Sequence, residues 1–462
     1  MAHRHCHDFT RGQLLRHAAA EAGRGLPQVE PGMPLPAGTG LTRRSMLMRS
    51  AGLALSVYGA SRLGLGALEA GVAEAAAPGQ PVLVSVFMEG GIDSMSVLAP
   101  TGDPLYRKLR PKLALPESQG TAFAEDQRLR WHPSAGGLAT LHGEGKVAVL
   151  PAVGYDHPDQ SHFNSRHFWE VGALDVRGAT GWMGRYLDRV GTGENPLQGL
   201  ALDGRLAPAL ATARVPVAAV EGPDDYSFWA RDVWGEVDGW MLDAFADIGA
   251  AHSARGAALG GAGEAAMQAG RLRQQLSGFR SKDGKPAYTS PVAYPDGGRE
   301  DFPKRLAALA AMLAAGLPLR CVALSAPGEY DTHDEQPADL ANGLRLTADT
   351  LLAFQRDLEA RGLAGRVIVH VWSEFGRRAE ENGSNGTDHG AAGVGFLVGS
   401  RVRGRMIGEF PGLRGGLDGK GNLRPTADFR GLYAALLEQW LGTDASGIIP
   451  DAGRFARPSL IA

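Results

Sequence analysis

Short apolar segments alternate with longer helical segments along the last third of the chain, and this pattern limits the possible folds most. Three short segments are typical of buried strands: 319–325, 366–372 and 393–398. Three longer segments have helical character: 301–315, 340–361 and 429–441. Asp301 is a candidate N-cap and Gly362 a candidate C-cap. The alternation predicts an α/β fold, a mostly parallel sheet with helices on both faces.

The first half of the chain is less regular but contains the same types of segment. Strands are predicted at 82–87, 147–151 and 215–220. Helices are predicted around 138–141, at 163–171 and over the Ala-rich stretch 238–279, which could form a cap or an insertion. The polar segment 280–299 contains Gly and Pro and is predicted to be a loop. Residues 78–462 are therefore expected to form one domain.

The N-terminal residues 1–77 have the order of an export leader. Arg43 and Arg44 precede the moderately apolar stretch 51–68, and the small residues of 73–78 follow as a predicted cleavage site. This order predicts recognition by the twin-arginine (Tat) translocase and a periplasmic or extracellular location. The apolar stretch is too short and too weakly hydrophobic for an integral membrane protein. A chance arginine pair before a cytosolic helix and an uncleaved membrane anchor are the alternatives.

Charge and cysteine content exclude several classes of protein. The net charge of −3 offers no electrostatic case for binding nucleic acid or an anionic membrane. Only two cysteines are present, and Cys6 lies in the leader, so a disulfide framework is excluded. Cys321 stands in an apolar run and is predicted to be a buried thiol. The leader cluster of His3, His5, Cys6 and His7 could bind metal or could be a solvated, disposable segment.

Acidic and histidine side chains follow the predicted strands at four places. They are Asp93, then Asp331 with His333, then Glu374, and finally Asp388 with His389. In open α/β sheets, ligands bind at the carboxyl ends of the strands, so these groups are expected to converge. Carboxylates with imidazoles suit a divalent metal such as zinc, manganese or magnesium. Two such ions would be able to clamp both oxygens of a phosphoryl or sulfuryl transfer.

Each of these groups also has a purely structural interpretation. Asp93 could be an ordinary turn residue, and Asp331 with His333 could form an Asx turn with a capping histidine. Glu374 could pair with Arg377, and the Gly-rich loop that carries Asp388 and His389 could be exposed and idle. The occurrence of all four groups after predicted strands favours a shared site. We therefore predict that Asp93, Asp331, His333 and His389 meet in or around one coordination shell.

Several segments together resemble a Tat-exported bacterial family called domain of unknown function 1501. They are FMEGGIDS (87–94), DQSHF (159–163), GWMGRYL (181–187), YDTH (330–333), SEFGR (373–377) and GTDHG (386–390). The resemblance covers nearly all of the chain after about residue 40, and SEFGR and TDHG are its most specific parts. The family is thought to belong with the alkaline phosphatase and sulfatase superfamily, which implies an alkaline-phosphatase-like α/β fold without supplying an activity.

The superfamily pattern carries over to this chain in part. Asp93 matches its first metal ligand, and Ser161 matches its nucleophile in order and in its position before a helix. His162 would orient a substrate oxygen. The superfamily's Asp-x-x-x-His is shortened here to Asp331-x-His333.

Two parts of that pattern stay open. The later Asp–His pair matches either Asp388 with His389, or Glu374 with His389 as the last ligand. Ser161 could instead be a simple helix N-cap, and Ser165 is a weaker candidate nucleophile because it would lie inside the helix.

Two functions remain open at this level. The first is an exported metal-dependent hydrolase of phosphate or sulfate esters, in which Ser161 attacks an unidentified small-molecule or polymer substrate. The second is a non-catalytic exported binding or assembly protein on a degenerate phosphatase-like scaffold. The altered ligand spacing favours the second function, and the retained Ser, Asp and His residues favour the first.

Overall fold

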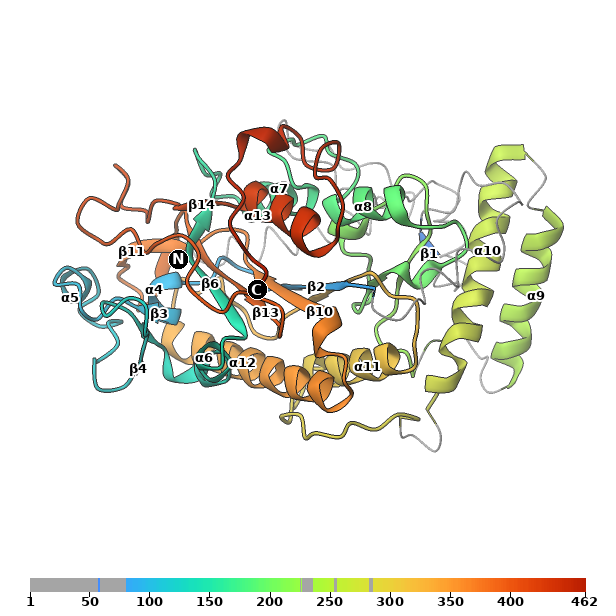
Figure 1. The fold of residues 1–462 in the computed structure, drawn as a ribbon, viewed down its shortest axis with the longest axis horizontal. Coiled ribbons are helices and arrows are strands. Elements are labelled where there is room, and N and C mark those ends of the chain that lie inside the picture. Colours follow the sequence, from blue (N-terminus) through green and yellow to red (C-terminus); the bar gives the residue numbers. More distant parts are fainter. Residues whose placement is uncertain (1–56, 59–79, 225, 227–235, 253–255, 282–285) are drawn as a thin grey trace.

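A nine-stranded mixed sheet forms the centre of the molecule (Figure 1). The computed structural model describes residues 57–58, 80–224, 226, 236–252, 256–281 and 286–462. The strands, in spatial order, are β1 (Val57–Tyr58), β8 (Val217–Ala219), β7 (Gly199–Ala201), β9 (Cys321–Ser325), β2 (Val82–Phe87), β10 (Val367–Trp372), β13 (Gly393–Val398), β6 (Val147–Gly154) and β14 (Ala427–Asp428). The pairings from β8 through β10 are all parallel, as is β6 with β14.

Helices cover both faces of this sheet (Figure 1). On one face lie α7 (His162–Val171), α8 (Trp182–Val190) and α13 (Phe429–Ala435). On the other lie α6 (Gly136–Gly143), α11 (Phe302–Ala314) and α12 (Gln336–Ala360). The predicted α/β class, with a mostly parallel sheet and helices on both faces, is confirmed.

The side-chain alternation of β2 divides the interior into two cores. Val82, Val84 and Val86 pack in the core that also contains the apolar residues of α6, α11 and α12. Leu83 and Phe87 point to the opposite face, into the core shared with α7, α8 and α13. Alternate residues of a strand face opposite sides, so a strand buried on both faces is apolar at nearly every position. The buried Cys321 of β9 belongs to the second core, as predicted.

One central strand departs from the expected parallel direction. β13 is antiparallel to both β10 and β6. The chain between β10 and β13 contains only a β-hairpin, formed by β11 (Arg377–Glu381) and β12 (Thr387–His389). A parallel return would need a crossover of a dozen or more residues, usually a helix, and this connection contains none. The sequence pattern did not indicate this hairpin.

The Ala-rich segment forms a helical hairpin at one end of the molecule (Figure 1). Its helices are α9 (Glu236–His252) and α10 (Gly256–Leu276), and α9 is the outer one. At the opposite end lie the short helices α4 (Ser94–Val97) and α5 (Tyr106–Leu109) with a small sheet of β3 (Leu98–Ala99), β5 (Arg130–Trp131) and β4 (Thr121–Ala122). No helix in the described ranges is long and apolar enough to cross a membrane.

Most of the predicted leader lies outside the described residues. This applies to Arg43 and Arg44, to the cleavage region 73–78, and to the histidine and cysteine cluster near the N-terminus. Val57 and Tyr58 are the exception, because they form β1 and pair antiparallel with β8 at the edge of the main sheet. Two residues of the predicted apolar stretch 51–68 therefore contact the domain.

Candidate metal centre

Four side chains from separate parts of the sequence meet at the carboxyl edge of the sheet. Asp331 and His333 lie in the loop after β9, His389 is the last residue of β12, and His162 is the first residue of α7. β2, β9 and β10 are neighbouring parallel strands, so the loops that follow them emerge at the same edge. The predicted convergence of Asp331, His333 and His389 is therefore found, and His162 joins them.

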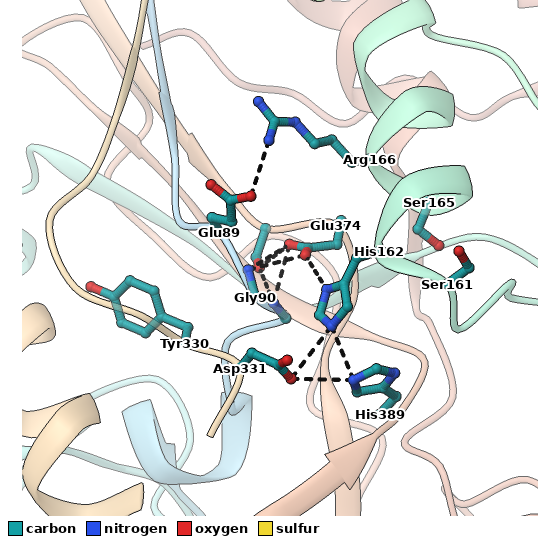
Figure 2. A network of polar contacts seen from close by, with 12 residues as sticks. Glu89, Gly90, Ser161, His162, Ser165, Arg166, Tyr330, Asp331, Glu374 and His389 are labelled. Atoms are coloured by element: carbon teal, nitrogen blue, oxygen red, sulfur yellow. Dashed lines mark hydrogen bonds and ion pairs between the residues drawn. The ribbon is translucent and has the colours of Figure 1, made fainter. Parts of the chain in front are cut away.

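Nitrogen atoms of three histidines surround one oxygen of Asp331, and Figure 2 shows two of them, His162 and His389. His389 Nε2 lies 3.0 Å from His162 Nε2 and 2.9 Å from His333 Nε2. Asp331 Oδ1 lies 3.4, 3.0 and 3.2 Å from the Nε2 atoms of His162, His333 and His389. Ligand atoms of His162, Asp331 and His389 all lie within 4.8 Å of one another, a spacing that fits a shared metal ion.

The other ring nitrogen of each histidine has its own acceptor. His162 Nδ1 donates to Glu374 Oε1 at 2.6 Å, and His333 Nδ1 lies 3.2 Å from Asp388 Oδ1. His389 Nδ1 lies 2.9 Å from the carbonyl oxygen of Gln160. A proton on each Nδ1 leaves the Nε2 lone pairs directed at one another. Lone pairs about 3 Å apart repel unless positive charge lies between them, and metal-bound histidines commonly have this outer arrangement.

The pKa shifts indicate that this cluster attracts positive charge. Burial would lower the pKa of His162, but hydrogen bonds with Asp331 and Glu374 outweigh it and raise that pKa to about 9. Burial would raise the pKa of Asp331, but hydrogen bonds from the three histidines and the charge of Arg377 hold it well below its usual range. The pKa of His389 is lowered, mainly by burial. The carboxylate is therefore ionised and available as a ligand.

Arg377 fastens the loops that carry these groups. Its side chain is buried and donates to Asp331 Oδ1 at 2.6 Å and to the carbonyl oxygen of Tyr330 at 3.0 Å. It also donates to the carbonyls of Gly90, Gly91 and Thr387. One planar guanidinium thus joins three separate loops. The alternative in which Glu374 pairs with Arg377 is not the one formed, since Arg377 pairs with Asp331.

Glu374 supports His162 and does not belong to the group of ligand atoms. Its buried carboxylate accepts hydrogen bonds from the backbone amides of Gly90 at 3.0 Å and Gly91 at 3.1 Å. Gly90 has φ of +116°, and a Cβ there would lie 2.3 Å from the amide nitrogen of Asp331, so a side chain is excluded. The prediction that Glu374 is a metal ligand is therefore corrected: its carboxylate oxygens accept hydrogen bonds from backbone amides and from His162.

Asp93 is held in an ion pair away from the histidines. Its Oδ1 accepts from Arg110 Nη2 at 2.9 Å, and its Oδ2 contacts Arg110 Nη1 and Ser96 Oγ. Both side chains are almost completely buried, and Asp93 also caps α4 through the amide of Met95. The predicted metal-ligand role of Asp93 is corrected on this ground. The sequence pattern around Asp93 could not show that the Arg110 guanidinium would form an ion pair with its carboxylate.

Gln336 was missed by sequence reasoning and connects Asp93 to the metal loops. Its Nε2 donates to Asp93 Oδ2 at 2.6 Å, and its Oε1 accepts from Thr332 Oγ1 at 3.1 Å and Thr387 Oγ1 at 2.6 Å. These threonines directly precede His333 and Asp388. The proximity of Gln336 to the Asp331–His333 motif was the only signal in the sequence.

Asp388 lies at the rim of the centre. Its side chain is 48% exposed and contacts His333 Nδ1 and Asn382 Nδ2, at 3.2 and 3.3 Å. It therefore orients His333 from outside, while the adjacent His389 faces the centre. Of the predicted ligand pair Asp388 and His389, only His389 belongs to the group whose ligand atoms lie close together.

Ser161 does not face the cluster. It occupies the N-cap position of α7, as predicted, but within the described part of the chain its side chain makes no capping hydrogen bond. Figure 2 shows its hydroxyl beside Ser165, on the other side of the helix start from His162. The expected orientation of Ser161 as a nucleophile is therefore wrong. His162, expected to orient a substrate oxygen, instead contributes to the group of ligand atoms.

The sequence comparison finds one family. The model described as "Protein of unknown function (DUF1501)" matches residues 256–420, a range that contains Asp331, His333 and His389. Among curated proteins, none matches the chain.

Solved structures with sequence identities of 10–12% show a weak overall similarity. Ps i-CgsB in complex with k-i-k-neocarrahexaose has a TM-score of 0.39 and 10% identity, over 82% of this chain and 75% of that chain. The PsFucS1 sulfatase from Pseudoalteromonas sp. has a TM-score of 0.34 and 11% identity, over 79% and 68%. The phosphonate monoester hydrolase SpPMH from Silicibacter pomeroyi has a TM-score of 0.30 and 12% identity, over 82% and 75%.

Proposed function

We propose that this protein is a metal-dependent hydrolase of phosphate or sulfate esters. The observation that carries the proposal is the meeting of the Nε2 atoms of His162 and His389 with one oxygen of Asp331, with His333 Nε2 close to both His389 and Asp331. The Nδ1 atom of each histidine is engaged by an outer acceptor. A divalent metal bound there supplies Lewis-acid polarisation of an ester oxygen and lowers the pKa of a coordinated water. The outer acceptors hold the imidazoles in the tautomer that binding requires.

We propose zinc as the metal, in a single site. Imidazole suits zinc better than it suits magnesium or manganese, which prefer oxygen ligands. Zinc bonds of about 2.0–2.1 Å in a tetrahedron place ligand atoms about 3.3 Å apart. The separations of 2.9–3.4 Å around His389 and Asp331 are close to that value. Among the described residues, Asp93 and Glu374 are already engaged and offer no second site, since Asp93 pairs with Arg110 and Glu374 binds the Gly90 and Gly91 amides.

A non-catalytic metal-dependent binding or assembly protein is the second candidate. The orientation of Ser161 favours it, because the hydroxyl expected to attack the ester does not face the cluster (Figure 2). Both candidate functions require the bound metal, but only the hydrolase turns over an ester. In the hydrolase, water must replace the serine as the attacking group.

Metal content and hydrolysis, measured on the same preparations, test the proposal. The purified protein is assayed by mass spectrometry for metals and with p-nitrophenyl phosphate and p-nitrophenyl sulfate as substrates. Asp331→Asn should lose both metal and hydrolysis. The matched control Asp243→Asn lies on α9, where the carboxylate is largely exposed, and should lose neither. Bound metal without hydrolysis of either ester favours the binding protein, and a wild type without metal refutes both candidates.

We further propose that residues 1–77 direct export through the Tat translocase, with cleavage within 73–78. The paired arginines, the apolar stretch and the small residues of the cleavage region support this. Replacing Arg43 and Arg44 together by lysine should retain the precursor inside the cell. Replacing Arg4 and Arg11 by lysine in the same leader is the matched control. Recovery of only uncleaved protein in the cytosol from the wild type, checked by N-terminal sequencing, would contradict export.

A further inference from the structure

A cavity of about 380 Å³ lies at the ends of β2, β9 and β10. Its volume is within the range of roughly 300–1,000 Å³ that is typical of small-molecule sites. The walls come from the ends of β2, β9 and β10, from α7 and from the loop after β7. The lining side chains include Phe87, Arg166, Glu170, Asp203, Ser325 and Trp372.

The cavity and the metal cluster share α7, and two cavity residues end the strands that lead to the loops beside the cluster. On α7, Arg166 and Glu170 follow His162 by four and eight residues, so all three lie along one side of the helix. Phe87 and Trp372 end β2 and β10, two residues before Glu89 and Glu374.

Arg166 bridges from the cavity to the loop beside the cluster. It contacts Glu89 Oε1 at 3.2 Å, directly above Glu374 and His162 in Figure 2.

Two acidic groups of the cavity, Glu170 and Asp203, pair with arginines, whereas Arg205 is an exposed cation of the lining. Arg166 Nε donates to Glu170 Oε1 at 3.0 Å, and Asp203 Oδ1 accepts from Arg305 Nη1 at 2.6 Å. Ser325 donates to Asp203 Oδ2 through both its amide and its hydroxyl, at 3.0 and 3.2 Å. These pairs place donors and acceptors side by side, which suits a hydroxyl group because it can both donate and accept.

Two aromatic rings provide the apolar part of the cavity wall. The rings of Phe87 and Trp372 have centroids 4.4 Å apart, and the guanidinium of Arg166 lies 4.5 Å from the Phe87 centroid. Trp372 Nε1 donates to Ser85 Oγ at 2.9 Å, which fixes the indole within the wall. An apolar wall next to paired donors and acceptors fits a compact ligand that carries both C–H faces and several hydroxyl groups.

We propose that this cavity binds a polyhydroxylated group, a sugar or a polyol, as the alcohol part of the ester whose acid group lies at the metal. The link to an ester rests on the proposed function, whereas binding of the free alcohol does not. The cavity residues thereby select the alcohol, and the metal cluster acts on the acid group.

Filling the cavity tests this proposal. Ala207 lines it, and Ala207→Trp should occupy the space of the ligand. Ala213→Trp places the same side chain on an exposed position outside the cavity and is the matched control. Gly204→Trp is a second cavity variant, since a Cβ there meets only the Glu221 carboxylate, at 3.7 Å. Circular dichroism checks the fold of each full-length variant, so that a misfolded Ala207→Trp is replaced by Gly204→Trp.

The probes are glucose, galactose, mannose, myo-inositol and glycerol, titrated calorimetrically into protein treated with EDTA. At least one probe should bind the wild type and Ala213→Trp, and the folded cavity variants should bind it at least tenfold more weakly. Failure of all five to bind the wild type overturns the proposal, as does undiminished binding by a folded cavity variant. Because the titrations are done without metal, a failure of the hydrolase proposal leaves their outcome unaffected.

Discussion

Gln336 and Asp93 are joined by a hydrogen bond of 2.6 Å between residues 243 positions apart in the chain. The same glutamine accepts hydrogen bonds from Thr332 and Thr387, one in each of the two segments that carry His333 and His389. The Arg110–Asp93 ion pair is thereby coupled to the metal loops. Asp93 acts on the centre through this network and not as a ligand.

Gln336→Leu should destabilise the protein by about 2–4 kcal/mol, because it leaves the Asp93 carboxylate and two threonine hydroxyls without their buried partner. Metal affinity should also fall, since the two loops lose their common anchor. Chemical denaturation and metal titration measure these effects. Gln274→Leu, on an exposed position of α10, should change stability by less than about 0.5 kcal/mol. Wild-type stability in Gln336→Leu would show that the network has no anchoring role.

Glu374→Gln should weaken metal binding by about 10–100-fold, the usual effect of losing an outer partner of a histidine ligand. The amide removes the negative charge that His162 Nδ1 meets at 2.6 Å and places a donor near the Gly90 amide. Competition with a chromophoric chelator gives the affinity. Glu380→Gln, at an exposed position of β11, is the control and should retain wild-type affinity. Equal affinities in the two variants would mean that Glu374 does not orient His162.

Ser161→Ala should leave metal content and any ester hydrolysis unchanged. Its hydroxyl lies beside Ser165 and faces away from the cluster (Figure 2). Stability should change by less than about 0.5 kcal/mol, below the usual cost of about 1 kcal/mol for an N-cap, because no side-chain capping bond forms in the described structure. Metal analysis and the two ester assays check this result. His162→Ala, at the next position, should lose metal; selective loss of hydrolysis in Ser161→Ala would restore Ser161 as the nucleophile.

His370→Leu should make the protein more resistant to acid. His370 lies in β10, is almost fully buried, and its two ring nitrogens have no hydrogen-bond partner within the described residues. Burial lowers its pKa from 6.5 to about 3. A histidine with a lowered folded-state pKa contributes stability that is present above pH 6.5 and is lost as the pH falls below that value.

Between pH 7 and pH 5, His370 lowers the free energy of unfolding of the wild type by about 2 kcal/mol. The leucine variant should not show this decrease. Urea denaturation of both proteins at pH 5, 7 and 8 measures the difference. The difference should change little between pH 7 and pH 8, where the histidine is mostly neutral in both states. A difference that does not change between pH 7 and pH 5 would contradict the lowered pKa.

The sequence by itself determined many of the local elements, although it did not indicate β7, α8 or the β11–β12 hairpin. The predicted strands 82–87 and 393–398 have the observed bounds, and the helix predicted at 163–171 begins one residue earlier, at His162. These elements could be predicted because their signals are local: burial on both faces, helical periodicity and the residues at helix ends all depend on a few neighbouring positions. The placement of Asp331, His333 and His389 after strands likewise predicted that they would meet.

Only the tertiary structure decided which acidic groups are available to a metal. Asp93 and Glu374 follow strands just as Asp331 does, yet Arg110 takes the first and the Gly90 and Gly91 amides take the second. The orientation of Ser161 was decided in the same way, because adjacent residues at a helix start point in different directions. These outcomes depend on partners tens to hundreds of residues distant, and a carboxylate near a strand end has the same local sequence signal whether it meets an arginine, an amide or a metal.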